Sequence, residues 1–141
     1  MNELQAAFGL LQLKYIEKLI LRRKKITELY REKLKGIQGI RLLIDMPDTE
    51  HNYSYFPIFI NEDYHRTRDE LYDYLKEFQI FTRRYFYPLI SDFSTYRGLP
   101  SANSDNLAEA NKIAKQVLCL PIYPALSDED IIDICKLIAA S

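Results

Sequence analysis

The chain of 141 residues carries a net charge of -1 and has a pI near 6.1. This balance excludes a nucleic-acid-binding domain held by a basic face. The length predicts one domain, residues 1–141, that is large enough to bury a core. The longest apolar run, around Cys119, is far too short to span a membrane, and the polar residues Asn2, Glu3 and Gln5 exclude a signal peptide. Because Cys119 and Cys135 lie in apolar sequence without CxxC spacing, we expect reduced core thiols in a cytoplasmic protein.

The first predicted element is a long helix over residues 4–35, which begins at a capping box of Asn2 and Gln5 and stops at Gly36. Its first half is apolar almost all round, a pattern typical of helices buried on every side. Its second half is amphipathic, with an apolar stripe of Ile26, Leu29, Tyr30 and Leu34. A helix of this span is roughly 50 Å long, whereas a compact domain of this size has a radius of gyration of about 14 Å. We therefore expect the helix to kink near Gly9 or to project beyond the domain.

Short strands and helices follow in mixed order. Apolar stretches predict four strands, at residues 40–44, 53–60, 80–85 and 117–120. Capping residues and helical periodicity predict three helices, at residues 67–78, 106–115 and 127–139. Pro57 makes the second strand an edge strand or introduces a bulge. The predicted class is α/β in the α+β sense: a small mixed or antiparallel sheet packed with helices and preceded by the long helix.

A run of two arginines, three aromatics and a proline begins at Arg83. Guanidinium forks grip phosphate oxygens, and aromatic faces with hydroxyl tips hold a sugar ring, so the run predicts a site for a sugar joined to a phosphate. The candidate binding residues are Arg83, Arg84, Tyr85 and Tyr87. Strand alternation would place Arg83, Tyr85 and Tyr87 on one face, and we favour that face because Phe86 is the natural core residue. The alternative is a strand that leaves the core with its arginines solvated.

The rest of the sequence offers little independent chemistry. Seven of the eleven tyrosines fall between Tyr53 and Tyr87, which suits a surface that faces a partner or a ligand. His51 and His65 lack metal-ligand spacing, so we expect no metal site. The motifs GxSxG, HExxH, GxGxxG and the P-loop are missing from the sequence, and we predict no catalytic residue in this chain.

Several segments in the right order resemble one known family. They are MNELQAAFGLLQL at residues 1–13, HNYSYFP at 51–57, RDEL at 68–71, RRYFYPL at 83–89 and LPIYPALSDED at 120–130. Over essentially its whole length the chain is similar to the C-terminal small domain of the DegT/DnrJ/StrS-like nucleotide-sugar aminotransferases. These are pyridoxal-phosphate (PLP) enzymes of fold type I.

The resemblance implies a reaction and a distribution of the functional residues between two domains. The family moves an amino group from glutamate to a ketone carbon of a nucleotide-linked sugar. Its Schiff-base lysine and most cofactor ligands lie in the large domain, to which nothing here corresponds. We therefore expect a C-terminal domain whose large PLP domain is absent from this sequence, and which binds no PLP by itself. By resemblance, His51 joins the substrate-binding candidates, and Asn2 would lie near the cofactor phosphate in the parent enzyme.

The resemblance also bears on partners and on the substrate. The apolar first helix would be covered by the large domain and by a neighbouring subunit, as a homodimer. The Arg83–Pro88 run looks like the subgroup that acts on dTDP-4-keto-6-deoxyhexoses, although Tyr85 stands where many members carry His. Two other functions stay open: a free-standing binding or dimerisation module without catalysis, and an aminotransferase for an unattached sugar or inositol. The upstream coding sequence distinguishes the first of these from an enzyme fragment.

Overall fold

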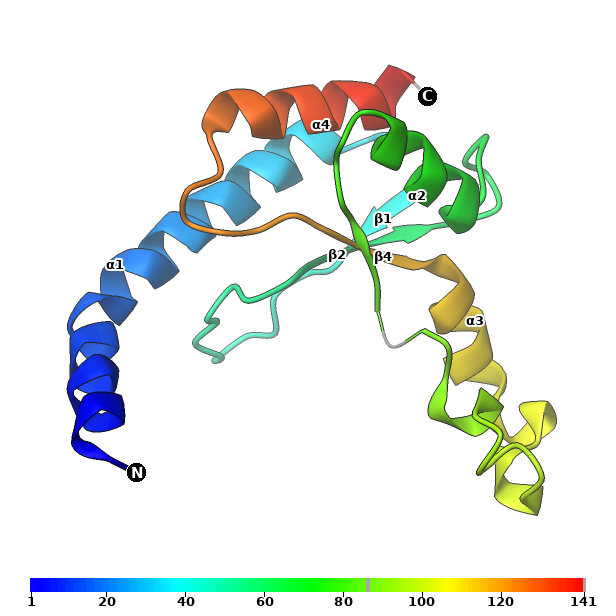
Figure 1. Ribbon diagram of the computed structural model, residues 1–141. Helices are drawn as coiled ribbons and strands as arrows, with labels where there is room; N and C mark the ends of the chain where they lie inside the picture. Colours follow the sequence, from blue (N-terminus) through cyan, green and yellow to red (C-terminus); the bar gives the residue numbers. More distant parts are fainter. Residues whose placement is uncertain (86, 141) are drawn as a thin grey trace.

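A computed structural model describes residues 1–85 and 87–140; Phe86, which the sequence assigns to the core, and Ser141 lie outside the described residues. The chain forms a four-stranded antiparallel sheet in the order β1-β2-β4-β3, joined and covered by helices (Figure 1). The strands are β1 (Ile40–Leu42), β2 (Phe56–Ile60), β3 (Arg83–Arg84) and β4 (Val117–Leu120). The helices are α1 (Glu3–Leu34), α2 (Arg68–Glu77), α3 (Ala108–Gln116) and α4 (Asp128–Ala140). The predicted class, with its long leading helix, is confirmed.

Helix α1 has the predicted capping box and projects beyond the sheet. The side chain of Asn2 accepts a hydrogen bond from the Gln5 amide at 2.9 Å, and the Gln5 side chain accepts one from the Asn2 amide at 3.0 Å. The helix runs unbroken through Gly9, and its first turns extend away from the rest of the chain (Figure 1). Leu10 and Leu13 are 69% and 67% exposed there. The expected projection is therefore confirmed, and the first turns also change direction relative to the rest of the helix (Figure 1). The described chain leaves this apolar half uncovered.

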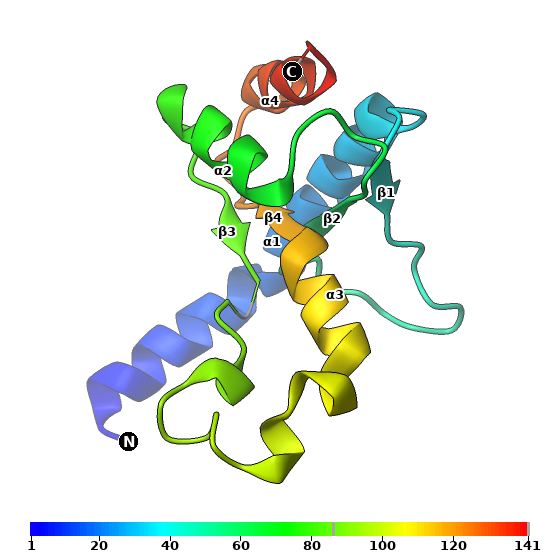
Figure 2. The same cartoon turned by 90° about the vertical axis from the view of Figure 1, so that its right-hand side faces the viewer.

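The second half of α1 forms one wall of the core. Ile26, Tyr30 and Leu34 of the predicted stripe are buried, and Leu29 packs partly buried against the core. The Tyr30 ring stacks on Phe56 with 4.8 Å between centroids, and its hydroxyl donates to the Pro121 carbonyl at 3.0 Å. Helices α2 and α4 lie together on one side of the sheet, and α3 extends away from it at the start of β4 (Figure 2). Alternate strand residues such as Leu118 and Leu120 face this helical layer.

The prediction for Pro57 was wrong for the strand as a whole. Strand β2 is internal, paired with β1 on one side and with β4 on the other. The register supplies the reason: β1 ends at Leu42 opposite Ile58, whereas β4 continues opposite Pro57. The proline therefore occupies a stretch of β2 that has a neighbour on one side only, where a missing N–H is tolerated.

The loop after β1 is tied to α1 by an ion pair that makes stability depend on pH. Arg31 donates to both carboxylate oxygens of Asp45, at 2.7 and 2.5 Å, and holds the pKa of Asp45 below its usual range. A carboxyl whose pKa is lowered by folding stabilises above its unfolded pKa, and the effect is lost as the pH falls through the folded pKa. We expect Asp45→Asn to lower the free energy of unfolding by no more than about 1 kcal/mol at pH 7, because both side chains are about a third exposed.

Urea unfolding of both proteins between pH 7 and pH 2 measures this. The difference should shrink below about pH 4, the ordinary range of an aspartate. Asp73→Asn, at an exposed position of α2, is the control, and its difference in unfolding free energy from the wild type should change little with pH. If the difference in unfolding free energy between Asp45→Asn and the wild type stays constant from pH 7 to pH 2, the Arg31–Asp45 ion pair does not cause the pH dependence.

Candidate functional site

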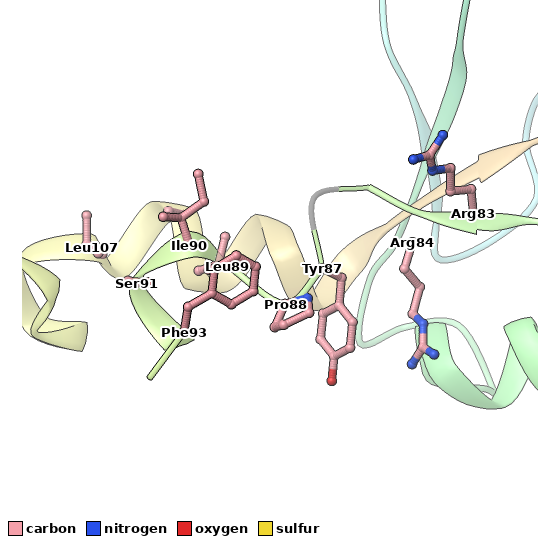
Figure 3. Close-up of a pocket in the computed structure, with 10 residues that line it drawn as sticks. Arg83, Arg84, Tyr87, Pro88, Leu89, Ile90, Ser91, Phe93 and Leu107 are labelled. Atoms are coloured by element: carbon pink, nitrogen blue, oxygen red, sulfur yellow. The ribbon is translucent and has the colours of Figure 1, made fainter. Parts of the chain in front are cut away.

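The candidate residues of the Arg83 run lie at the edge strand β3 and in the turn that follows it (Figure 3). Arg84 pairs in register with Leu118 and faces the helical layer, whereas Arg83 pairs with Cys119 and points to the opposite face. Alternation along a strand produces this separation. Arg83 is exposed, and the side chain of Arg84 is 32% exposed. The two arginines thus meet different surroundings.

Arg84 belongs to a cluster with α2, which we call the Arg84 cluster: Arg68, Asp69, Tyr72, Arg84 and Tyr87. The Arg84 guanidinium lies 4.5 Å from the Tyr72 ring centroid and 4.8 Å from that of Tyr87, and its Nη1 donates to Asp69 at 3.1 Å. The Arg68 guanidinium lies 4.7 Å from the same Tyr87 centroid. Two cations therefore lie within 4.8 Å of the Tyr87 ring centroid, and the ring quadrupole attracts each of them.

The Arg84 cluster shows that the prediction of Arg83, Tyr85 and Tyr87 on one face was wrong for Tyr87. Tyr87 lies with Arg84, as Figure 3 shows, and not with Arg83. The reason is that β3 comprises only Arg83–Arg84, so the period of two does not extend to Tyr87. Tyr85 packs edge-to-face on Tyr55, with 5.4 Å between ring centroids.

The electrostatics of the cluster leave an excess of positive charge. Asp69 Oδ1 lies 2.9 Å from Arg68 Nε and 3.1 Å from Arg84 Nη1, so one carboxylate serves two guanidiniums. Burial lowers the pKa of Arg68, the Asp69 carboxylate raises it, and the like charge of Arg84 lowers it. Both arginines remain cationic at neutral pH because a guanidinium is far from deprotonation. The cluster therefore carries one more positive than negative charge.

A cavity of about 580 Å³ opens beside this charge. Arg83, Arg84 and Tyr87 line one end, and the remaining lining is mostly apolar: Pro88, Leu89, Ile90, Ser91, Phe93, Leu107 and Ala110. Figure 3 shows the apolar side chains gathered away from the two guanidiniums. A site with a cationic end and an apolar floor suits a ligand that joins an anionic group to a flat ring.

The other candidate residues lie elsewhere. His51 belongs to the loop between β1 and β2, where its Nε2 is 3.7 Å from Asp45 and its ring centroid is 5.8 Å from that of Tyr53. Asn2 caps α1 through its side chain. Three of the predicted residues, Arg83, Arg84 and Tyr87, thus meet at one cavity.

Sequence reasoning missed Arg68 and Asp69 as site residues. The sequence contains a signal, because Arg68 has the helical spacing of Leu71 and Leu75, and the structure buries all three. An arginine at a core position of an amphipathic helix indicates a buried charge that has a partner.

The residues of this chain do not fit a covalent PLP site. Every lysine in the described ranges is exposed, whereas a Schiff-base lysine acts from a desolvated pocket or beside another cation. Within the same ranges, His, Cys, Asp and Glu side chains form no group of three or more that could hold a metal ion. No helix in the described part of the chain has the length and apolarity needed to cross a membrane.

Comparison with solved structures identifies the class of protein. DesI, solved in the presence of its TDP-sugar product, matches 99% of this chain with a TM-score of 0.89 and 30% identity, and the match covers 35% of that structure. DesV of S. venezuelae, solved in complex with a ketimine intermediate, matches with a TM-score of 0.87 and 28% identity over 99% of this chain and 36% of that structure. The fold is that of the C-terminal part of sugar aminotransferases.

The sequence comparisons name the family. Residues 1–139 match the model of the DegT/DnrJ/EryC1/StrS aminotransferase family, and the chain belongs to this PLP-dependent family. It is 52% identical over 138 residues to an Escherichia coli dTDP-4-amino-4,6-dideoxy-D-glucose transaminase, and the match covers 98% of this chain and 37% of that protein. A Shigella dysenteriae transaminase of the same name is 44% identical over 129 residues, or 92% of this chain and 35% of that protein. The chain spans about a third of the length of these relatives.

Proposed function

We propose that this chain serves as the C-terminal domain of a PLP-dependent aminotransferase that moves an amino group from glutamate to a dTDP-linked keto-deoxy sugar. The observation that carries the proposal is the cavity at β3, whose cationic end suits a diphosphate and whose apolar floor suits a base or sugar ring. The 52% identity to the E. coli transaminase supports dTDP as the nucleotide. In this proposal a large domain holds PLP, which supplies the amino-group chemistry, while residues of this chain bind the sugar nucleotide.

A chimeric enzyme tests the proposal. The matching 138 residues of the E. coli transaminase are replaced by the corresponding residues of this chain, and transamination of a dTDP-4-keto-6-deoxyhexose with glutamate is measured. We expect activity that depends on both substrates, since the 52% identity covers nearly all of this chain. A folded chimera that transaminates no nucleotide sugar refutes the assignment. A chimera that prefers an unattached sugar supports the alternative substrate class.

We further expect the chain alone to hold no PLP covalently, because its lysines are exposed and lack the desolvated setting of a Schiff-base lysine. The purified chain is mixed with stoichiometric PLP, treated with borohydride and analysed by peptide mass spectrometry. Labelling should be weak and spread over several lysines, whereas the chimera should be labelled at one lysine of its large domain. Stoichiometric labelling at a single lysine of the chain contradicts the expectation.

The exposed half of α1 favours a second role, in association. Leu10 and Leu13 are mostly exposed, with Leu4, Phe8 and Leu11 on the same half of the helix, and apolar patches of this kind mark interfaces. We propose that this half of α1 contacts a large domain and a second subunit. The chain alone should then self-associate, and Leu10→Glu with Leu13→Glu should yield a monomer in analytical ultracentrifugation. Gln12→Glu adds charge at an exposed polar position and should leave the association intact. A wild-type chain that is monomeric at high concentration refutes this role.

A further inference from the structure

Arg68 is a charged residue in a core position. It is 3% exposed, at the first position of α2, on the same stripe as the fully buried Leu71 and Leu75. Burying a guanidinium costs free energy that only well-placed partners offset, and an apolar side chain often fills such a position at least as well. The partners of Arg68 therefore indicate what its charge contributes.

Those partners connect Arg68 to the cavity indirectly. Its guanidinium lies 4.7 Å from the Tyr87 ring centroid, its Nε lies 2.9 Å from Asp69 Oδ1, and its Nη1 donates to the Val117 carbonyl at 3.5 Å. Tyr87 lines the cavity, as does Arg84, which contacts both Tyr87 and Asp69. Arg68 thus touches two of the three side chains that contact Arg84, namely Asp69 and Tyr87, and the third is Tyr72.

The shared carboxylate has an electrostatic consequence. If Asp69 served Arg84 alone, the two would form a closed ion pair, and the charge of Arg84 would be largely compensated at short range. Because Arg68 competes for the same Oδ1 atom, part of the Arg84 charge remains uncompensated. The Arg68 guanidinium also contacts the Tyr87 ring that Arg84 contacts, so it helps to fix the position of that ring beside Arg84.

We propose that Arg68 is a positioning residue that acts through Asp69 and Tyr87 to present an uncompensated Arg84 guanidinium to an anionic group in the cavity. The chemical class of that group is the phosphate of a nucleotide, and this part rests on the proposed function. The arrangement of Arg68, Tyr87 and Arg84 is independent of it and exists without ligand.

The first test uses the full chain without ligand and follows the arginine Nε–Hε signals by NMR. Arg68→Lys keeps the charge but removes the planar fork, so the Arg84 signal should move. Arg66→Lys is the matched control, since Arg66 lies 4.2 Å from a different ring, that of Tyr74; it should leave the Arg84 signal unchanged. If Arg68→Lys does not fold, Tyr87→Leu replaces it, because Tyr87 is 49% exposed. That variant should move the Arg68 and Arg84 signals together. An Arg84 signal that is unaffected in a folded variant overturns the proposal.

The second test titrates the same proteins with dTDP. Arg68→Lys should weaken dTDP binding by on the order of tenfold, the size expected for a misplaced charge-assisted contact, and Arg66→Lys should leave it unchanged. An unchanged affinity in Arg68→Lys overturns the proposal even when the Arg84 signal moves. If the wild-type chain and the chimera both fail to bind dTDP, the nucleotide assignment of the proposed function fails. Whether Arg68 positions Arg84 is then decided by the ligand-free NMR spectra alone.

Discussion

Replacing Gly39 by alanine is expected to destabilise the domain by roughly 2–5 kcal/mol or to prevent folding. Gly39 precedes β1 with a φ of +77°, and its carbonyl accepts a hydrogen bond from Asn61 at 2.8 Å. A Cβ at this position would lie 2.2 Å from the Tyr64 nitrogen and 2.4 Å from its Cα. Because these are backbone atoms, relief requires the chain segments to separate. The left-handed backbone adds roughly 1–2 kcal/mol for a residue with a Cβ, and forced overlap in a packed region typically adds 1–3 kcal/mol.

Gly36 is the matched control for this prediction. It has a similar φ of +83°, but a Cβ there meets no described atom within 4 Å. Gly36→Ala should therefore cost only the roughly 1–2 kcal/mol of the left-handed backbone, whereas Gly39→Ala should cost roughly 2–5 kcal/mol or prevent folding. Urea unfolding followed by circular dichroism compares the two. Equal losses for both variants would show that the close approach to Tyr64 relaxes without cost.

Local signals in the sequence predict the elements of this fold well. Asn2 with Gln5, and Thr67 with Glu70, are capping boxes in the structure, as their spacing indicates. Ser127 accepts from the Asp130 amide at 3.0 Å at the start of α4. These interactions span three residues, so the sequence contains all the information that they need.

Strand lengths and the candidate site depend on contacts that sequence periodicity does not contain. The strand predicted over residues 80–85 is reduced to Arg83–Arg84, because pairing with β4 is limited to Leu118 and Cys119. Beyond the end of β3, a tertiary contact brings Tyr87 to Arg68 on α2. Alternation therefore predicts the opposite faces of Arg83 and Arg84, whereas it does not predict that Tyr87 lies with Arg84.

The separation of the two arginines leads to a prediction for the chimeric enzyme. Arg83 is exposed at the cationic end of the cavity and lies on the face opposite the Arg84 cluster. We propose that it contacts the diphosphate of the sugar nucleotide directly, since a guanidinium fork matches two phosphate oxygens. Arg83→Ala in the chimera should then raise the KM for the dTDP-sugar on the order of 10- to 100-fold, which corresponds to the roughly 1.5–3 kcal/mol of a charge-assisted hydrogen bond.

The control and the companion variant make this prediction specific. Arg41 is an exposed arginine of β1 whose guanidinium lies 4.0 Å from the Phe59 ring centroid, and Arg41→Ala should leave the KM for the dTDP-sugar nearly unchanged. Tyr85→Phe removes a hydroxyl from a ring that packs on Tyr55. Because that hydroxyl is a candidate sugar contact, Tyr85→Phe should raise the KM for the dTDP-sugar, but by less than Arg83→Ala does. The KM for glutamate should change little in all three variants, because only the sugar nucleotide carries a diphosphate. If Arg83→Ala raises the KM values for glutamate and for the dTDP-sugar equally, Arg83 supports the fold or the active site as a whole. The alternative of a solvated arginine on a departing strand holds if neither KM changes.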